Sequence, residues 1–295
     1  MWIQERTIEK QDAGVLRGDE PSERRLREWV RHLAVPRHVF ANSRSNRWVR
    51  EELAAAFERH GLSVQLQGRY GNVVALPRDA RGCAVTFVAA HYDSVPDCPG
   101  ADDNASGLAV MLECARVLAE TECRHHVGFI AFNAEEDGLL GSRDFVTNGL
   151  PALRVDLRSV HVLEMVGFRG ESEHQELPFP WVPGRLRVPD FIGLLGKGRA
   201  NASVDLAIGQ AVAPDLRVLA AKTWGPLHRL LPALTRSDHF PFWDAGLPAL
   251  LWTDTADYRN PHYHLATDTP ETLDYRFMRD VAQLLSATVS EEAQS

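Results

Sequence analysis

Three short runs of apolar residues stand out along the chain, and each is typical of a strand buried on both faces of a sheet. The runs are CAVTFVAA at 83–90, VGFIAFN at 127–133 and SVHVLEMV at 159–166. Residues 105–120, between the first two runs, carry apolar side chains at helical spacing, and a second helix is predicted near 141–148. Strands that alternate with helices predict an α/β fold of three layers, with helices on both faces of a central mixed, mostly parallel sheet.

Weaker patterns extend this fold toward both ends of the chain. The other predicted elements are helices at 22–34, 43–60 and 275–289, strands at 62–67, 72–76 and 247–255, and a loop at 260–275. Gly61 stands where a helix commonly ends. Residues 1–20 have no such pattern, and we expect them to form a loose leader.

Residues 168–236 depart from the pattern because they are rich in proline and glycine, as in ELPFPWVPGRLRVP. We expect this segment to be a lid or insertion over the site, within one domain that spans 1–295. Four aromatic side chains are candidates for an apolar pocket, although core packing is the commoner role for such residues: Phe179, Trp181, Trp224 and Trp243.

Composition and charge narrow the function classes. The 295 residues include 40 acidic and 32 basic ones, for a formal net charge of −8. Binding to a nucleic-acid backbone needs a basic face, so we expect no nucleic-acid partner. No apolar stretch is long enough to cross a bilayer, and the opening MWIQERTIEKQDAG lacks the apolar core of a signal peptide. We therefore expect a cytoplasmic protein without a membrane partner; the oligomeric state is not predicted.

The four cysteines do not form a C-x-x-C pair, and they are too few for a disulfide scaffold in a chain of this size. We expect mostly buried thiols. A disulfide through the loop residue Cys98 is the alternative.

Carboxylates and histidines follow the predicted buried strands. His91 and Asp93 come after the first strand, Glu135 and Glu136 after the second, and Glu164 at the end of the third. Ligands of such sheets bind outside the carboxyl ends of the strands. Crowded carboxylates repel one another, and divalent cations relieve that repulsion. Histidine nitrogens and carboxylate oxygens without cysteine fit a catalytic zinc site.

Further polar residues are expected at the same edge of the sheet: Asp103, Asp238, His239 and His264. Two metal ions that share one bridging carboxylate would explain why so many acids are needed.

Each of these residues also has an ordinary structural role as an alternative. For Asp102 and Asp103 in GADDNASG, the alternative is that they cap a helix and bind no metal. Glu135 and Glu136 are compatible with a solvated helix start, which the helix dipole favours. Glu164 fits such a role poorly, because a lone glutamate in an apolar strand is rarely tolerated unless it is paired or bound to metal.

Six blocks of the sequence together resemble a known family. In chain order they are AHYDS, GADDNASG, FNAEEDGLLGS, LEMVG, SDHFPFW and NPHYHLATDTPETLDY. They resemble the signature blocks of the zinc aminopeptidases of the bacterial leucyl aminopeptidase type (metallopeptidase family twenty-eight), whose fold glutaminyl cyclases share. The resemblance covers roughly 70–170 and 235–280, and it is specific because all six blocks occur in the same order.

The resemblance implies two zinc ions per chain. The implied ligands are His91 and Glu164 at the first zinc, Glu136 and His264 at the second, and Asp103 as the bridge between them. Most characterised members have aspartate at the position of Glu164. Glutamate is one methylene longer, so the reach and geometry of the first zinc site change.

The resemblance also implies roles for residues around the metals. Glu135 would be the general base, Asp93 would orient His91, and Asp102 would support the loop. A cis peptide bond is expected between Asp103 and the residue that follows it.

Three functions are compatible with these residues. The leading hypothesis is a zinc-dependent hydrolase of peptide or amide bonds, an aminopeptidase that releases N-terminal residues from a peptide or small amide. Asp238 and Tyr263 are the expected substrate contacts.

The second hypothesis is a glutaminyl cyclase-like acyltransferase with one zinc on Asp103, Glu136 and His264. The cyclases carry a tryptophan where Gly141 stands and another where this chain has Tyr263. The third is a metal-free, peptidase-like binding module, although every ligand position here holds a residue able to bind metal.

Overall fold

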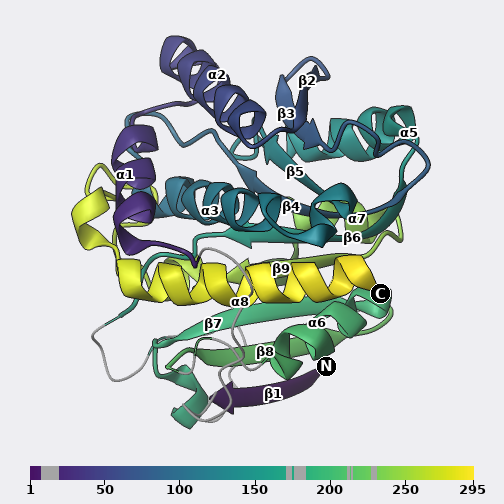
Figure 1. The fold of residues 1–295 in the computed structure, drawn as a ribbon. Helices are drawn as coiled ribbons and strands as arrows, with labels where there is room; N and C mark the ends of the chain where they lie inside the picture. The colour runs from purple at the N-terminus through teal and green to yellow at the C-terminus, as the bar shows by residue number, and fades with distance from the viewer. Residues whose placement is uncertain (8–19, 171–174, 176–183, 211–212, 214, 227–230) are drawn as a thin grey trace.

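In the part of the chain that the structure describes, nine strands form one sheet in the order β1-β8-β7-β9-β6-β4-β5-β3-β2 (Figure 1). This computed structural model describes residues 1–7, 20–170, 175, 184–210, 213, 215–226 and 231–295. The strands are β1 (Trp2–Thr7), β2 (Ser63–Gln67), β3 (Asn72–Leu76), β4 (Ala84–His91), β5 (Val127–Phe132), β6 (Asp156–Glu164), β7 (Phe191–Lys197), β8 (Arg217–Thr223) and β9 (Ala249–Thr253).

The centre of the sheet is parallel and its outer parts are mixed. Strands β5, β4, β6 and β9 are parallel neighbours. Antiparallel pairs join β3 to β5, β2 to β3, β7 to β9 and β1 to β8, while β7 and β8 are parallel. The predicted mixed sheet is confirmed, with its parallel strands where the site residues occur.

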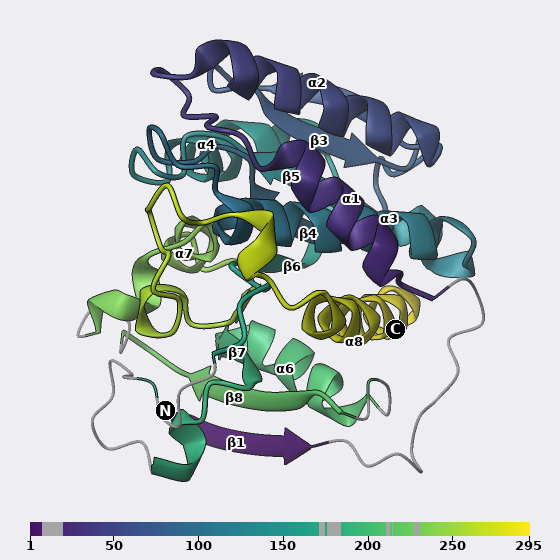
Figure 2. The ribbon, with the colours of Figure 1, turned by 90° about the vertical axis from the view of Figure 1, so that its left-hand side faces the viewer.

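Helices cover both faces of this sheet. They are α1 (Glu23–Leu33), α2 (Ser43–Arg59), α3 (Gly107–Ala119), α4 (Leu140–Asp144), α5 (Leu150–Leu153), α6 (Asn201–Gly209), α7 (His239–Asp244) and α8 (Tyr275–Gln294). Helices α1, α3, α6 and α8 pack together on one face, and α7 packs on β6 and β9 from the other. Figure 2 shows α1 and α8 on one side of the strands and α4 and α7 on the other.

Strand β4 is buried along nearly its whole length, and it is apolar apart from Thr86 and His91, because both of its faces are covered. Val88 and Ala90 belong to the core beneath α1, α3 and α8, whereas Phe87 and Ala89 belong to the core on the opposite face. Successive side chains of a strand point to opposite faces, so a continuous apolar run serves two cores.

The expectation of a loose leader at residues 1–20 is wrong for its first part. Residues 2–7 form β1, which pairs with β8 at the edge of the sheet. WIQERT is too polar to be identified as a strand from its pattern, and its pairing with β8 decides its structure. Residues 8–19 lie outside the described residues.

The segment 168–236 contributes to the sheet. Its described part includes β7, α6 and β8, which extend the sheet beyond β9. A role for this segment as a lid stays a prediction.

All four cysteines are free thiols. Cys83 is half-buried, and Cys98, Cys114 and Cys123 are buried. The expectation of mostly buried thiols is confirmed, and Cys98 forms no disulfide. Among the described residues, no helix is both long and apolar enough to cross a bilayer.

A buried carboxylate ties the end of α8 to the sheet. Glu292 accepts hydrogen bonds of 2.7 Å from the hydroxyls of Ser159 and Ser203, and it lies 2.7 Å from His161 Nε2. The indole N–H of Trp252 donates to His161 Nδ1, which leaves the Nε2 proton to face Glu292. Burial raises the pKa of Glu292, but the contacts with His161 and the serines outweigh burial and lower it to about 2.

We predict that Glu292→Gln lowers the free energy of unfolding by about 2 kcal/mol at pH 7, because the surrounding donors lose their charged acceptor. A lowered folded-state pKa gives a stabilisation that is complete above the ordinary value of 4.5 and is lost as the pH falls from 4.5 toward 2. Urea unfolding of both proteins across this range should therefore show the difference shrinking.

The matched control is Glu291→Gln, since Glu291 is exposed beside it on the same helix. We expect this variant to stay within about 0.5 kcal/mol of wild type. Equal losses in the two variants would contradict the role of the buried network.

Candidate metal centre

The parallel strands carry the predicted residues to one edge of the sheet. His91 is the last residue of β4 and Glu164 is the last residue of β6, its parallel neighbour. Glu135 and Glu136 follow β5, the parallel neighbour of β4 on its other side. Because the three strands end at the same edge, their following side chains converge.

Asp103 approaches this edge from the segment η2 (Ala101–Ser106), which leads into α3. The peptide bond between Asp103 and Asn104 is cis, as expected. The Asn104 side chain donates to the carbonyl of Leu163 and accepts from the N–H of Met165, so η2 is bonded directly to the end of β6.

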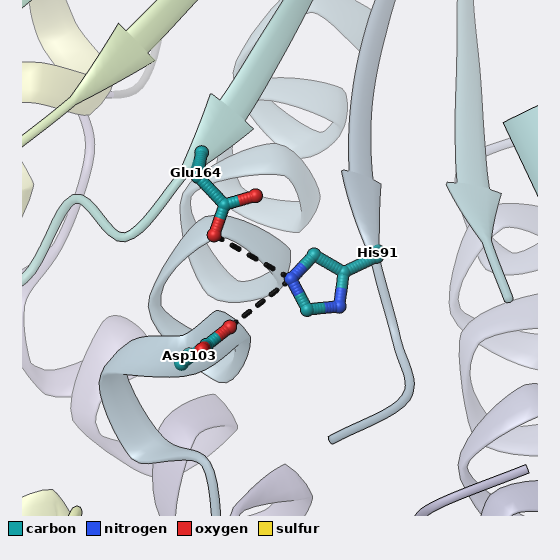
Figure 3. Close-up of side chains that lie close together, drawn as sticks. All are labelled: His91, Asp103 and Glu164. Carbon is teal, nitrogen blue, oxygen red and sulfur yellow. Dashed lines mark ion pairs between the residues drawn. The ribbon is translucent and has the colours of Figure 1, made fainter. Parts of the chain in front are cut away.

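Figure 3 shows His91, Asp103 and Glu164 with their polar atoms pointing toward one another. His91 Nε2 lies 3.1 Å from Asp103 Oδ1 and 3.6 Å from Glu164 Oε1. The hydroxyl of Ser237 donates to the other Glu164 oxygen at 2.6 Å. His91, Asp103 and Glu164 offer one ligand atom each, and these three atoms lie within 4.8 Å of one another, as a metal site requires.

A second group shares Asp103. His264 Nε2 lies 3.1 Å from Asp103 Oδ2 and 3.2 Å from Glu136 Oε2. The two oxygens of Asp103 therefore face two different imidazoles, one on each side. Such an arrangement permits one carboxylate to bridge two metal ions.

Asp93 contacts both the imidazole of His91 and the backbone of the Glu135–Glu136 pair. It lies 3.4 Å from His91 Nδ1. Its two oxygens accept hydrogen bonds of 3.2 Å from the backbone N–H groups of Glu135 and Glu136. One fully buried carboxylate thus holds both the end of β4 and the loop after β5.

Burial and mutual charge shift the pKa values of this cluster strongly. Burial and the nearby Asp103 raise the pKa of Glu136 to about 7. Burial also raises the pKa of Glu135 well above its ordinary value, although the charge of His91 opposes it. Burial lowers the pKa of His264, but its contacts with Asp103 and Glu136 outweigh burial and raise it to about 10.

Several polar atoms in the cluster are buried without a hydrogen-bond partner among the described residues. They are Nδ1 and Nε2 of His91, Asp103 Oδ1, Glu136 Oε1 and His264 Nε2. Buried polar atoms are normally satisfied, so an unsatisfied group of imidazole nitrogens and carboxylate oxygens needs an explanation. The donor set is the one that Zn²⁺ prefers outside thiolate sites, and the residues therefore fit zinc.

The buried Arg37 holds the loop before Asp103, and the sequence analysis missed it. Its guanidinium donates to the carbonyl oxygens of Tyr92, Pro99 and Gly100. Gly100 has φ of +61°, and a Cβ there would lie 2.2 Å from the carbonyl oxygen of Asp103. Nothing in the sequence around Arg37 distinguishes it from a solvated arginine, because its partners are backbone carbonyls far along the chain.

Asp102 supports the loop as expected. Its oxygens accept from the N–H of Gly167 at 2.9 Å and from the side chain of Asn260 at 2.7 Å. Asp268, which the sequence analysis also missed, accepts from the backbone N–H groups of Asp102 and Asp103. Three loops that are far apart in sequence are joined in this way beneath the centre.

A cavity of about 180 Å³ opens beside the cluster, lined by Asp103, Glu135, Glu136 and Glu164 among others. Tyr263 also lines it, and its ring stacks on His264 with 3.7 Å between centroids.

Among the described residues, Asp238 and two of the expected aromatic side chains do not line this cavity, and a substrate contact by Asp238 stays a prediction. Asp238 is fully buried and is not among its lining residues, whereas its neighbours Ser237 and His239 are. Residues 236–238 form a turn between a short 3-10 helix (Pro232–Thr235) and α7, where adjacent side chains point in different directions, and the sequence does not say which one faces the cavity. Trp224 is 55% exposed and Trp243 is buried in the core, so neither lines the cavity. Phe179 and Trp181 lie outside the described residues.

Comparison with known sequences identifies relatives of this chain. It is 34% identical over 230 residues to the uncharacterized protein YfbL of Escherichia coli (strain K12), covering 72% of this chain and 68% of YfbL. It is 32% identical over 227 residues to Aminopeptidase YwaD of Bacillus subtilis (strain 168), covering 75% of this chain and 44% of YwaD. The chain therefore spans about two thirds of one relative and less than half of the other.

Solved structures share the fold. The LapA aminopeptidase of Legionella pneumophila matches with a TM-score of 0.70 at 19% identity, covering 93% of this chain and 73% of that one. The glutaminyl cyclase of Porphyromonas gingivalis matches with a TM-score of 0.65 at 21% identity, covering 92% and 98%. The sequence profile of Peptidase family M28 matches residues 72–289, which include all of the clustered histidines and carboxylates. The chain belongs to peptidase family M28.

Proposed function

We propose that the chain is a zinc aminopeptidase that binds two zinc ions. The observation that carries this proposal is the position of Asp103, whose two oxygens each lie 3.1 Å from a different imidazole. His91 and Glu164 complete the ligands on one side, and Glu136 and His264 complete them on the other. The name of the relative YwaD, an aminopeptidase, supports the same activity.

Zinc at such a site supplies a water of lowered pKa and polarises the carbonyl of the scissile amide. Glu135 is the general base in this proposal. It lines the cavity, and its backbone is fixed by Asp93, so its carboxylate has a defined position beside the ligands. Glu135 takes a proton from water and later delivers it to the leaving amine.

The substrate is a peptide or small amide with a free amino group in this proposal. The acids that line the cavity attract an ammonium group, which favours cleavage next to an N-terminal residue. Tyr263, stacked on His264, is the proposed substrate contact at the second metal. The cytoplasmic location stays a prediction.

The glutaminyl cyclase alternative has a specific observation against it. A Cβ built at Gly141 would lie 2.1 Å from the carbonyl oxygen of Asn133 and 2.5 Å from Asn72 Oδ1. This backbone therefore has no room for the tryptophan that the cyclases carry at the corresponding position.

We predict that the purified chain contains about two zinc ions and hydrolyses aminoacyl-nitroanilides. Removal of the metal by a chelator should abolish hydrolysis, and added zinc should restore it, because the metal supplies the activated water. Elemental analysis measures the zinc content per chain, and a panel of nitroanilides measures the rate of hydrolysis. One zinc per chain, with cyclisation of an N-terminal glutamine peptide and no hydrolysis, would support the cyclase alternative instead.

We also predict that Glu135→Gln lowers kcat by about 10²–10⁴-fold, because the amide cannot accept the proton. Its zinc content should stay at the wild-type level, since Glu135 is not one of the proposed ligands. The matched control is Glu58→Gln, at an exposed position on α2, which should leave both quantities unchanged. Loss of zinc together with activity would argue that Glu135 is a ligand rather than the base.

A further inference from the structure

The floor of the cavity continues away from the carboxylates along the face of the sheet. Strand pairing places Glu164 beside Thr253 on β9, Thr253 beside Gly193 on β7, and Gly193 beside Leu219 on β8. Residues directly opposite one another in neighbouring strands point to the same face of a sheet. Glu164, a proposed zinc ligand, is therefore the first member of a row that crosses four strands.

A second row lies beside the first on the same face. Leu251 on β9 pairs with Leu195 on β7, Leu195 with Ala221 on β8, and Ala221 with Ile3 on β1. Every residue of the two rows lines the cavity. The surface that leads away from Glu164 is apolar apart from Thr253, and we call these two rows the apolar floor.

The apolar floor is partly open to solvent. Ile3, Gly193, Leu219 and Ala221 are half-buried, whereas their neighbours in sequence on the opposite face of β7 and β8 are buried beneath α6. Four strand spacings of about 4.8 Å separate β6 from β1, or roughly 19 Å. This distance exceeds the reach of a leucine side chain.

Gly193 makes the floor hollow at its middle. It stands between Thr253 and Leu219, and a Cβ there would lie 3.0 Å from the carbonyl oxygen of Thr253 and 3.6 Å from its methyl group. Any side chain at this position would fill the space between the carboxylates and the outer strands.

Ile3 closes the floor at its outer end. It belongs to β1, the edge strand of the sheet. Strand β1 also lies outside the residues that match the family profile, 72–289. A wall of the cavity therefore comes from a part of the chain that the family profile does not include.

We propose that Gly193 and Ile3 determine specificity by setting the depth and the length of the apolar floor, which accepts an unbranched apolar side chain longer than that of leucine. This inference rests on the proposed function, because the side chain belongs to the residue that precedes the scissile amide. The ammonium group of that residue lies among the carboxylates, and its side chain extends across β9, β7 and β8 toward β1.

The test uses 2-aminoalkanoyl nitroanilides whose straight side chains have two to twelve carbons, so that the longest ones approach the outer end of the apolar floor. We expect kcat/KM of the wild-type protein to rise about three- to fourfold with each added methylene, continuing beyond the length of leucine. A kcat/KM that stops rising at four carbons would overturn the proposal.

Two variants test which part of the apolar floor limits the length of the substrate side chain. Ile3→Trp should lower kcat/KM at least tenfold for the longest substrates and less than twofold for the shortest. Gly193→Ala should lower it for intermediate and long substrates alike, because the obstruction lies nearer the carboxylates. The matched control is Gln4→Trp, which places the same side chain on the opposite face of β1 and should follow the wild-type series. Thermal unfolding verifies that each variant is folded.

A binding measurement separates this inference from the proposed function. Calorimetry with n-alkylamines from butyl to decyl needs no turnover, and affinity should rise with chain length in wild type and Gln4→Trp but level off earlier in Ile3→Trp. Length-dependent binding without hydrolysis would contradict the aminopeptidase proposal and support the apolar floor. Hydrolysis with binding that is independent of chain length would overturn the apolar floor and leave the aminopeptidase proposal intact.

Discussion

Asp103 faces His91 on one side and His264 on the other, while Glu136 and Glu164 lie close to the same imidazoles. Buried carboxylates that lie this close together are unfavourable when charged. Burial and the charge of Asp103 together raise the pKa of Glu136 to about 7. Cations bound between the acids and the imidazoles would reverse that balance. Because these buried carboxylates repel one another, the loops that carry them need many hydrogen bonds from the surrounding residues to keep their positions.

The supporting groups hold backbone as well as side chains. Arg37 binds the carbonyl oxygens before Asp103, and Asp268 binds the N–H groups of the loop. Asp93 fixes the N–H groups after β5 and contacts His91. Ligand positions set by buried hydrogen bonds to backbone are rigid, which suits a centre whose geometry has to be in place before the metal binds.

The same sheet joins two different environments. Its parallel centre ends in carboxylates and imidazoles, because the carboxyl ends of parallel strands share one edge. The outer strands β7, β8 and β1 present an apolar face to the same cavity. A charged centre beside an apolar surface suits the proposed substrate, which carries an ammonium group and an apolar side chain.

The sequence by itself determined the α/β pattern, the buried central strands and the histidines and carboxylates that follow them, because local periodicity and motif spacing carry that information. Only the tertiary structure decided that residues 2–7 form a strand, that Arg37 and Asp268 hold the loop of Asp103, and that Ser237 rather than Asp238 faces the cavity. These features depend on partners distant in the chain, on strand pairing and on side-chain direction at a turn. None of them leaves a periodic signal in the sequence.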